Sequence, residues 1–247
     1  MRKVLLLIAG CAVLAACGGT APTAPTAVAR LSRTRFLAFG DSLTSGEVTA
    51  PIGGIFAPGS AALVPSQRLI VVPSAAYPSV LQGLLQARYV AQTSSISVIN
   101  AGKGGESLVD GAVRIREAVS ENRPEVVLLM EGVNGLPIMG PDFSAELTRE
   151  MVQTAKAQGA RVFLASMLPT IPGRQRSQPV GDLVAFDLRL EQLAFQEGAV
   201  FVDLYNRLQP EVASVIGIDG LHPTEAGYRR IADIFFAAIQ ANLEVKP

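Results

Sequence analysis

Residues 40–46 read GDSLTSG and directly follow the apolar run RFLAF. A serine between a short strand and a Gly-flanked turn can be a nucleophile, and Ser42 holds that position. It can also be an ordinary turn serine. A serine hydroxyl attacks a carbonyl only when a neighbouring base removes its proton. Chemistry at Ser42 therefore requires a base, a group that orients this base, and donors for an oxyanion.

The chain of 247 residues contains one histidine, His222, within the segment DGLHP. Histidine is the usual base near neutral pH, so His222 is the candidate partner of Ser42. Asp219 stands three residues before it. In a turn this spacing lets the carboxylate reach the imidazole, fix its tautomer and stabilise its charged form. A histidine before a proline is also common as a capping or surface residue. A catalytic role for Asp219 and His222 therefore needs support from the remaining segments.

Two further segments can supply donors for an oxyanion, which needs two or three of them. The Gly-rich segment NAGKGGES at 100–107 offers backbone N–H groups, and GVNG at 132–135 offers the side-chain amide of Asn134. Each segment alone would also suit a simple turn. It is the set of four segments, in this order, that points to acyl chemistry at a serine.

The apolar runs of the chain predict the scaffold that brings these segments together. Continuous aliphatic runs bounded by Gly, Pro or Asn are typical of strands in a parallel sheet covered on both faces. Such runs occupy residues 35–39, 95–100, 125–131, 161–166 and 200–204. Ligands of open α/β sheets bind outside the C-terminal ends of the strands. The four segments lie near such ends and can therefore converge on one rim.

Helical patterns separate the predicted strands. Apolar residues recur on one face, which predicts helices over residues 143–158, 182–197 and 224–243. In the first helix this apolar face consists of Phe143, Leu147, Met151 and Ala155. Asp142 is placed to cap its start. The alternation of strands and helices predicts right-handed βαβ units and an α/β fold, a three-layer α/β/α doubly wound parallel sheet of about five strands.

Residues 47–76 interrupt this alternation with several prolines and glycines and no clear period. An insertion of this length, directly after a candidate nucleophile, is more often functional or mobile than neutral. Its apolar part, residues 52–72, could form a wall for an acyl group. The alternative is a surface excursion without a role.

Composition excludes several other classes of protein. The formal net charge is zero and 49% of the residues are hydrophobic, which argues against a disordered or nucleic-acid-binding chain. No cysteine follows Cys17, and there is only one histidine. Because zinc sites normally use these two residue types, we do not expect a zinc site. Acyl chemistry at a serine implies neither a metal nor an organic cofactor.

The N-terminus predicts a targeting segment. Arg2 and Lys3 precede the apolar run VLLLIAGCAVLAA, which suits a signal peptide and is too short for a membrane span. The sequence LAAC at 14–17 resembles the bacterial lipobox, which implies cleavage before Cys17 and lipid attachment to it. An ordinary cleaved signal is the alternative. Residues 18–30 are rich in Gly, Pro, Thr and Ala, which indicates a tether. By the same resemblance, Gly18 implies sorting to the outer membrane where two membranes exist.

Taken together, the four segments resemble the SGNH, or GDSL, hydrolase family over roughly residues 33–243. FGDSLTSG is similar to the nucleophile block of that family, NAGKGGES to its glycine block, GVN to its asparagine block and DGLHP to its Asp-x-x-His block. The resemblance implies that Ser42 is the nucleophile and that Asp219 and His222 complete a triad. It also implies an oxyanion hole formed by the N–H groups of Ser42 and Gly105 and the side chain of Asn134.

Two features of the pattern stay open. Gly104 is adjacent to Gly105, and either could be the backbone donor; Gly105 keeps the spacing N-x-G-x-x-G. Family members often carry an aspartate after the asparagine of the third block, whereas Gly135 stands here. What supports the Asn134 loop is therefore not evident from the sequence. No G-x-S-x-G motif is present, so the α/β-hydrolase elbow is not the model.

The expected function is that of a serine ester hydrolase that works through an acyl-enzyme on Ser42. Its substrate is predicted to be a simple or lipid-like acyl ester, or alternatively an O-acetyl group on cell-wall or environmental polysaccharide. A non-catalytic binding lipoprotein with the same fold is an alternative from another class. The expected organisation is a signal peptide at 1–16, a lipidated Cys17 with a tether over 17–32, and a hydrolase domain at 33–247. The protein is then anchored by lipid in the cell envelope, with no nucleic-acid partner.

Overall fold

The computed structural model describes residues 28–51 and 67–245. Its centre is a sheet of five parallel strands in the spatial order β5-β2-β6-β7-β8. The strands are β2 (Arg35–Gly40), β5 (Ser97–Gly102), β6 (Val126–Met130), β7 (Arg161–Ala165) and β8 (Val200–Val202). The five predicted strands and the α/β fold class are thereby confirmed. The predicted signal peptide, Cys17 and most of the predicted tether lie outside the described residues.

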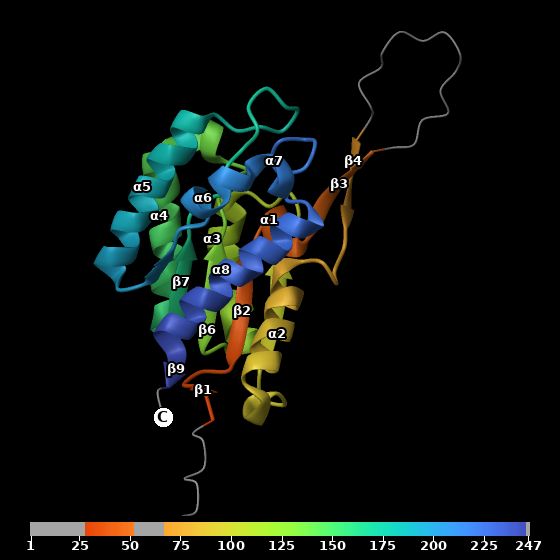
Figure 1. Ribbon diagram of the computed structural model, residues 1–247. Helices are drawn as coiled ribbons and strands as arrows, with labels where there is room; N and C mark the ends of the chain where they lie inside the picture. Colours follow the sequence, from red (N-terminus) through yellow and green to blue (C-terminus); the bar gives the residue numbers. More distant parts are fainter. Residues whose placement is uncertain (1–27, 52–66, 246–247) are drawn as a thin grey trace, which may run out of the picture.

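Helices cover both faces of this sheet, which gives the predicted three layers (Figure 1). On one face α2 (Tyr77–Arg88) packs beside α8 (Glu225–Leu243). On the other face α3 (Leu108–Asn122), α4 (Leu136–Ala157) and α5 (Val180–Glu197) pack in a row. Because both faces are covered, β6 is buried along its whole length, and its sequence VVLLM has no polar position.

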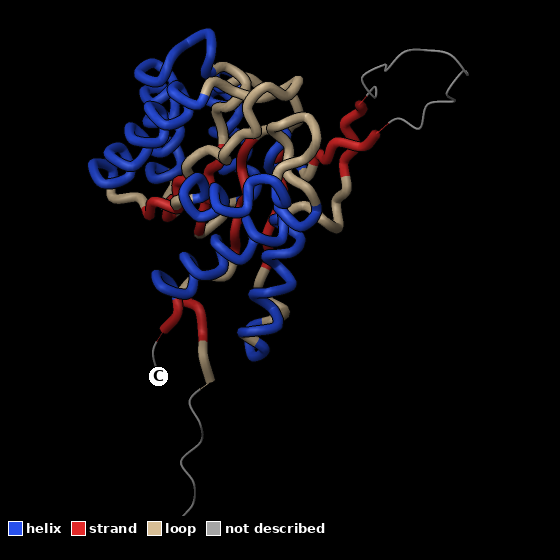
Figure 2. Tube along the Cα trace, turned by 45° about the horizontal axis from the view of Figure 1, so that its top comes forward, coloured by secondary structure: helices blue, strands red, loops and turns tan. Residues whose placement is uncertain are grey.

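The strand order creates a switch point at β2. The chain moves from β2 to β5 on one side and then returns to β6 on the other. In doubly wound sheets the loops at such a point diverge and leave room for a ligand. Figure 2 shows loops gathered at this end of the molecule. The segments that follow β2, β5 and β6 are those that carry Ser42, Gly105 and Asn134.

Two of the predicted helices agree closely with the structure, and the third differs at its start. The helices predicted over 182–197 and 224–243 correspond to α5 and α8. Helix α4 begins before the predicted range, and Gly140 interrupts it with φ 75° and ψ 165°, directly before Pro141. After this kink the buried face consists of Ser144, Ala145, Thr148, Met151, Val152 and Ala155.

The prediction that Phe143 belongs to the apolar face of this helix is wrong. Phe143 is 54% exposed, because it lies one position off the buried face that starts at Ser144. Asp142 was expected to cap the helix, but its carboxylate pairs with Arg189 of α5. Helices α2 and α3 were not predicted. A signal for α3 is nevertheless present, since the Ser107 hydroxyl caps it by accepting the N–H of Asp110.

The insertion at 47–76 begins and ends as a β-hairpin. Strands β3 (Glu47–Pro51) and β4 (Gln67–Val71) pair antiparallel and project from the domain (Figure 1). Residues 52–66 lie outside the described part of the chain, so the predicted acyl-binding wall over 52–72 stays a prediction.

Short elements complete the fold. They are α1 (Ser42–Ser45), η1 (Val90–Gln92), α6 (Leu204–Leu208), η2 (Gln209–Glu211) and α7 (Val212–Val215). Strand β1 (Arg30–Leu31) pairs antiparallel with β9 (Glu244–Val245). The predicted tether over 17–32 therefore overlaps at its end with a strand of the fold. No helix among residues 28–51 and 67–245 combines the length and apolarity that crossing a membrane requires.

Candidate active site

The segment GDSLTSG forms a single helical turn at the C-terminal end of β2. Ser42 is the first residue of α1, and Asp41 caps it because its Oδ1 accepts the N–H of Leu43 at 2.9 Å. Gly46 ends the turn in the left-handed conformation, with φ 96°. Gly40 is required by close packing, since a Cβ there would lie 2.1 Å from the carbonyl oxygen of Met130. These contacts fix the backbone on both sides of Ser42.

The structure brings Ser42, His222 and Asp219 into one chain of hydrogen bonds. Ser42 Oγ lies 2.9 Å from His222 Nε2, and His222 Nδ1 lies 2.6 Å from Asp219 Oδ2. The other carboxylate oxygen, Oδ1, accepts the N–H groups of Leu221 and His222 at 3.0 Å each. When the proton of neutral His222 is on Nδ1, facing Asp219, Nε2 can accept the proton of the Ser42 hydroxyl.

Asp219 is held in its charged form. Burial raises its pKa, but the hydrogen bonds from His222 and from the N–H of Leu221 outweigh burial and hold the pKa at about 2. The carboxylate is therefore ionised throughout the neutral range. It can orient the imidazole and stabilise the imidazolium without taking a proton itself.

The loop between β7 and α5 supports the turn that carries Asp219, and no residue of this loop was predicted to belong to the site. The Thr170 hydroxyl donates to the carbonyl oxygen of Gly220 at 2.6 Å, and the N–H of Arg176 donates to that of Asp219 at 2.8 Å. The guanidinium of Arg176 also approaches the triad, with Nε 4.0 Å from Asp219 Oδ2. The only sequence signal for this loop is its place after a predicted strand, at the rim where ligands bind.

Gly105 and Asn134, the other two predicted oxyanion donors, lie on two loops that are joined by a hydrogen bond. Asn134 Nδ2 donates one hydrogen bond to the carbonyl oxygen of Glu106 at 2.9 Å, which leaves the second N–H of this amide for another acceptor. Gly105 has φ 72°, in the left-handed region. A Cβ at Gly104 would lie 1.8 Å from Glu47 Oε1, so Gly104 packs directly against the root of the hairpin.

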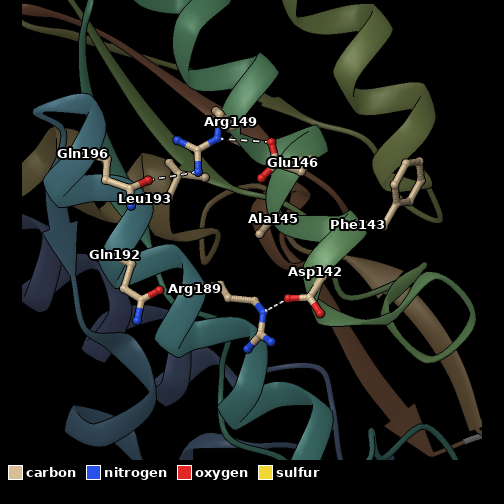
Figure 3. A pocket seen from close by; sticks show the side chains of 9 residues that line it. All are labelled: Asp142, Phe143, Ala145, Glu146, Arg149, Arg189, Gln192, Leu193 and Gln196. Carbon is tan, nitrogen blue, oxygen red and sulfur yellow. Dashed lines mark hydrogen bonds and ion pairs between the residues drawn. The ribbon is translucent and has the colours of Figure 1, made fainter.

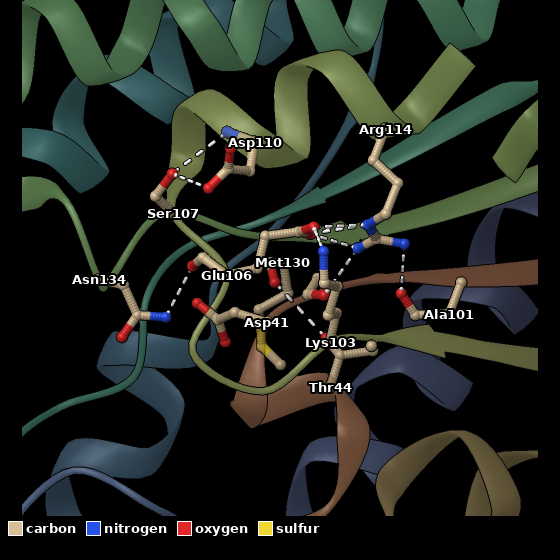
Figure 4. Close-up of polar contacts among 12 residues, drawn as sticks. Asp41, Thr44, Ala101, Lys103, Glu106, Ser107, Asp110, Arg114, Met130 and Asn134 are labelled. Carbon is tan, nitrogen blue, oxygen red and sulfur yellow. Dashed lines mark hydrogen bonds and ion pairs between the residues drawn. The ribbon is translucent and has the colours of Figure 1, made fainter. Parts of the chain in front are cut away.

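A buried ion pair holds the glycine loop to the sheet (Figure 4). Arg114 of α3 donates from Nε to both carboxylate oxygens of Glu106, at 2.7 and 2.8 Å. It also donates to the carbonyl oxygens of Ala101 at 3.0 Å and Gly40 at 3.3 Å. Since the carbonyl of Glu106 accepts from Asn134, this pair supports the Asn134 loop, which has Gly135 in place of the aspartate common in the family pattern.

Asp41 is the remaining carboxylate at the base of Ser42. It is fully buried, and its Oδ2 has no hydrogen-bond partner within the part of the chain that the structure describes. Burial raises the pKa of Asp41 to about 6, although the N–H of Leu43 and the charge of His222 act in the opposite direction. Through its Oδ1, Asp41 caps the turn that carries Ser42.

A surface groove of about 620 Å³ between α4 and α5 contains none of these residues (Figure 3). Its charged side chains are already paired: Arg149 contacts Glu146 at 3.2 Å, and Arg189 pairs with Asp142. Among the described residues there is also no group of three or more His, Cys, Asp or Glu side chains that could hold a metal ion. The chemistry of the molecule is concentrated at the C-terminal edge of the sheet.

Comparison with known proteins gives one family. The model described as "GDSL-like Lipase/Acylhydrolase family" matches residues 38–230, which include Ser42, Gly105, Asn134, Asp219 and His222. Esterase TesA of Pseudomonas aeruginosa is 28% identical over 152 residues, which are 61% of this chain and 73% of that protein. An acetylxylan esterase of Xylanibacter ruminicola is 24% identical over 186 residues, 66% of this chain but only 38% of that longer protein.

Solved structures show the same fold. The lipase/acylhydrolase of Enterococcus faecalis superposes with a TM-score of 0.64, covering 87% of this chain and 99% of the other, at 19% identity. The match covers most of both chains, so the two proteins share the fold described above.

Proposed function

We propose that this chain, which belongs to the GDSL-like Lipase/Acylhydrolase family, cleaves carboxylic esters through an acyl-enzyme on Ser42. That it is a hydrolase acting on ester bonds follows from the family and from its esterase relatives. The non-catalytic alternative is therefore set aside. The observation that carries the mechanism is the hydrogen-bond chain Ser42–His222–Asp219 at the switch point of the sheet.

The first half of the reaction forms the acyl-enzyme. His222 Nε2 takes the proton of Ser42 as Oγ attacks the carbonyl carbon, and Asp219 stabilises the resulting imidazolium. The carbonyl oxygen becomes negative, and the N–H groups of Ser42 and Gly105 with the amide of Asn134 donate to it. The carbon–oxygen bond to the alcohol then breaks, and the alcohol leaves with the proton from His222. In the second half, water repeats these steps and releases the acid.

For the substrate we propose a simple or lipid-like acyl ester. Esterase TesA of Pseudomonas aeruginosa, which matches this chain over 73% of its own length, supports this choice. An O-acetyl group on a polysaccharide is the second candidate, and the similarity to an acetylxylan esterase favours it. The absence of tryptophan disfavours a platform for stacking sugars.

We further propose that Cys17 carries lipid and anchors the enzyme in the cell envelope. The sequence LAAC at 14–17 and the Pro/Thr/Ala-rich residues that follow it support this. A lipid on Cys17, joined to the domain through the predicted tether, would hold the domain near a bilayer.

A series of p-nitrophenyl esters from acetate to palmitate, with acetylated xylan assayed in parallel, tests the substrate class. We expect turnover of p-nitrophenyl esters, with Ser42→Ala as the inactive control. Release of acetate from xylan at a higher kcat/KM than from any p-nitrophenyl ester would favour the second candidate. If none of these esters is hydrolysed, the proposed function is refuted.

A further inference from the structure

Glu131 is a buried carboxyl group that the proposed mechanism does not use. It follows the last residue of β6 and stands three residues before Asn134. Only 2% of it is exposed, and neither side-chain oxygen has a hydrogen-bond partner among the residues that the structure describes. Burying such a group without partners costs stability. The position is thus unfavourable for folding, and it lies in the segment that leads from β6 to Asn134, a proposed oxyanion donor.

The surroundings of Glu131 explain which form of the carboxyl group is buried. Helix α3 packs against it, since a Cβ on Gly111 would lie 3.2 to 3.5 Å from its Cγ, Cδ and Oε2 atoms. The charged groups that act on it electrostatically are Asp41 at the end of β2, Glu106 in the glycine loop and Arg114 on α3. Arg114 is already bonded to Glu106 and does not bond Glu131.

Burial and two neighbouring carboxylates oppose a negative charge on Glu131. Burial raises its pKa well above the ordinary value, and the carboxylates Asp41 and Glu106 raise it further, while Arg114 and the nearby backbone N–H of Gly132 act in the opposite direction. The protonated form is therefore the one that the folded protein favours, and it persists to a higher pH than for an ordinary glutamate.

We propose that Glu131 is a positioning residue of the reaction, which supports the turn carrying Asn134 in its neutral form and weakens transition-state stabilisation when it is charged. The inference rests on the proposed function. A neutral carboxyl group fills the space between β6 and α3 without adding charge. A carboxylate in the same place repels the negative charge that develops on the substrate oxygen, and in a buried site this repulsion is poorly screened.

The variant Glu131→Gln tests this, because glutamine has nearly the same shape and cannot ionise. The quantity to measure is the ratio of kcat for the variant to kcat for the parent across pH, with a p-nitrophenyl ester as substrate. We expect a ratio near one at the acidic end of the activity profile that rises to roughly three- to tenfold toward its alkaline end. KM should change little, because the repulsion acts on charge that develops in the transition state. A ratio that does not change with pH would overturn the proposal.

Asp187→Asn is the matched control. Asp187 is another largely buried acid, and burial raises its pKa to about 8, but it faces Met167 and Asp203 rather than the Asn134 turn. Its removal should leave the pH profile of kcat unchanged. If Asp187→Asn alters the profile as Glu131→Gln does, the effect is a general one on the fold and the proposal fails.

Thermal melts separate this inference from the proposed function. The folded pKa of Glu131 lies above its unfolded value, so the folded state binds more protons between the two values and stability falls as pH rises through that window. Glu131→Gln removes this loss. The Tm of the variant should therefore exceed that of the parent by an amount that grows with pH, whether or not any ester is turned over. Equal pH dependence of Tm in the two proteins would contradict a neutral buried Glu131.

Discussion

Ser42 is held between contacts that do not depend on its hydroxyl group. The cap from Asp41 and the packing of Gly40 fix the turn, and Oγ itself bonds only His222 among the described residues. Removing the hydroxyl should therefore affect the reaction far more than the fold.

Ser42→Ala is expected to lower kcat by roughly 10⁴-fold or more, as deletions within a triad do, with a Tm close to that of the parent. His222→Ala should match it, because the chain has no other imidazole. Steady-state kinetics and thermal melts of both variants check this. A variant that keeps a tenth of the parent activity would rule out Ser42 as the nucleophile.

Asn134 has two possible roles that one pair of substitutions separates. It can donate to the oxyanion, or it can merely suit the backbone of the turn. Asn134→Ala should lower kcat by roughly 10²–10³-fold with little change in KM if the amide is a donor. Asn134→Gly accepts any backbone conformation but offers no side-chain donor, so it should be equally impaired. If glycine restores activity where alanine does not, the donor role is wrong.

At the scale of the residue, sequence reasoning is most specific where chemistry restricts the residue type. A triad needs an imidazole, and the chain has only His222, so this choice had no competitor. Sequence reasoning did not identify Arg114 or Glu131. Their importance depends on which charges lie close together after folding, and nothing in the sequence distinguishes them from other charged residues.

At the scale of the element, the ion pair between Arg114 and Glu106 joins α3, the glycine loop and the ends of β2 and β5. The Glu106 side chain is fully buried, whereas that of Arg114 is 22% exposed. Removal of Arg114 would leave the buried Glu106 carboxylate with Lys103, at 3.3 Å, as its remaining ion-pair partner among the described residues.

Arg114→Met should destabilise the protein by about 3 kcal/mol, because it breaks a buried ion pair. It should also lower kcat, since the carbonyl of Glu106 holds the amide of Asn134. Arg114→Lys keeps the charge but loses the bidentate geometry, and we expect an intermediate loss. Denaturant unfolding and kcat check these effects. The double variant Glu106→Gln/Arg114→Met should recover part of the stability, and the ion-pair explanation fails if it does not.

The helices show where periodicity is sufficient and where it is not. Helices α5 and α8 have regular apolar faces, and the sequence predicts both. In α4 the kink at Gly140 shifts the buried face by one position, so extrapolating the pattern back to Phe143 failed. Helix α2 lacks a side-chain cap, and in the β3–β4 hairpin the strand QRLIV has no regular alternation. Neither pattern stands out before the tertiary contacts are known.

At the scale of the whole molecule, lipid attachment and catalysis are predicted to be separable. Cys17 precedes the family match, which begins at residue 38. Cys17→Ser should move the protein from the membrane fraction to a soluble or uncleaved form and leave the kcat of the purified domain unchanged. Cell fractionation and ester assays measure the two effects. An unmodified Cys17 thiol in the native protein, found by mass spectrometry, would contradict lipidation.

The pairing of β1 with β9 has a consequence for any way of holding the enzyme. It brings the two ends of the described fold together at the pole opposite α1 (Figure 1). A solid support or a fusion partner joined at either end is therefore placed away from the catalytic rim. An immobilised enzyme would present its candidate active site to the surrounding liquid. Its turnover of dissolved esters should therefore not depend on which end is attached.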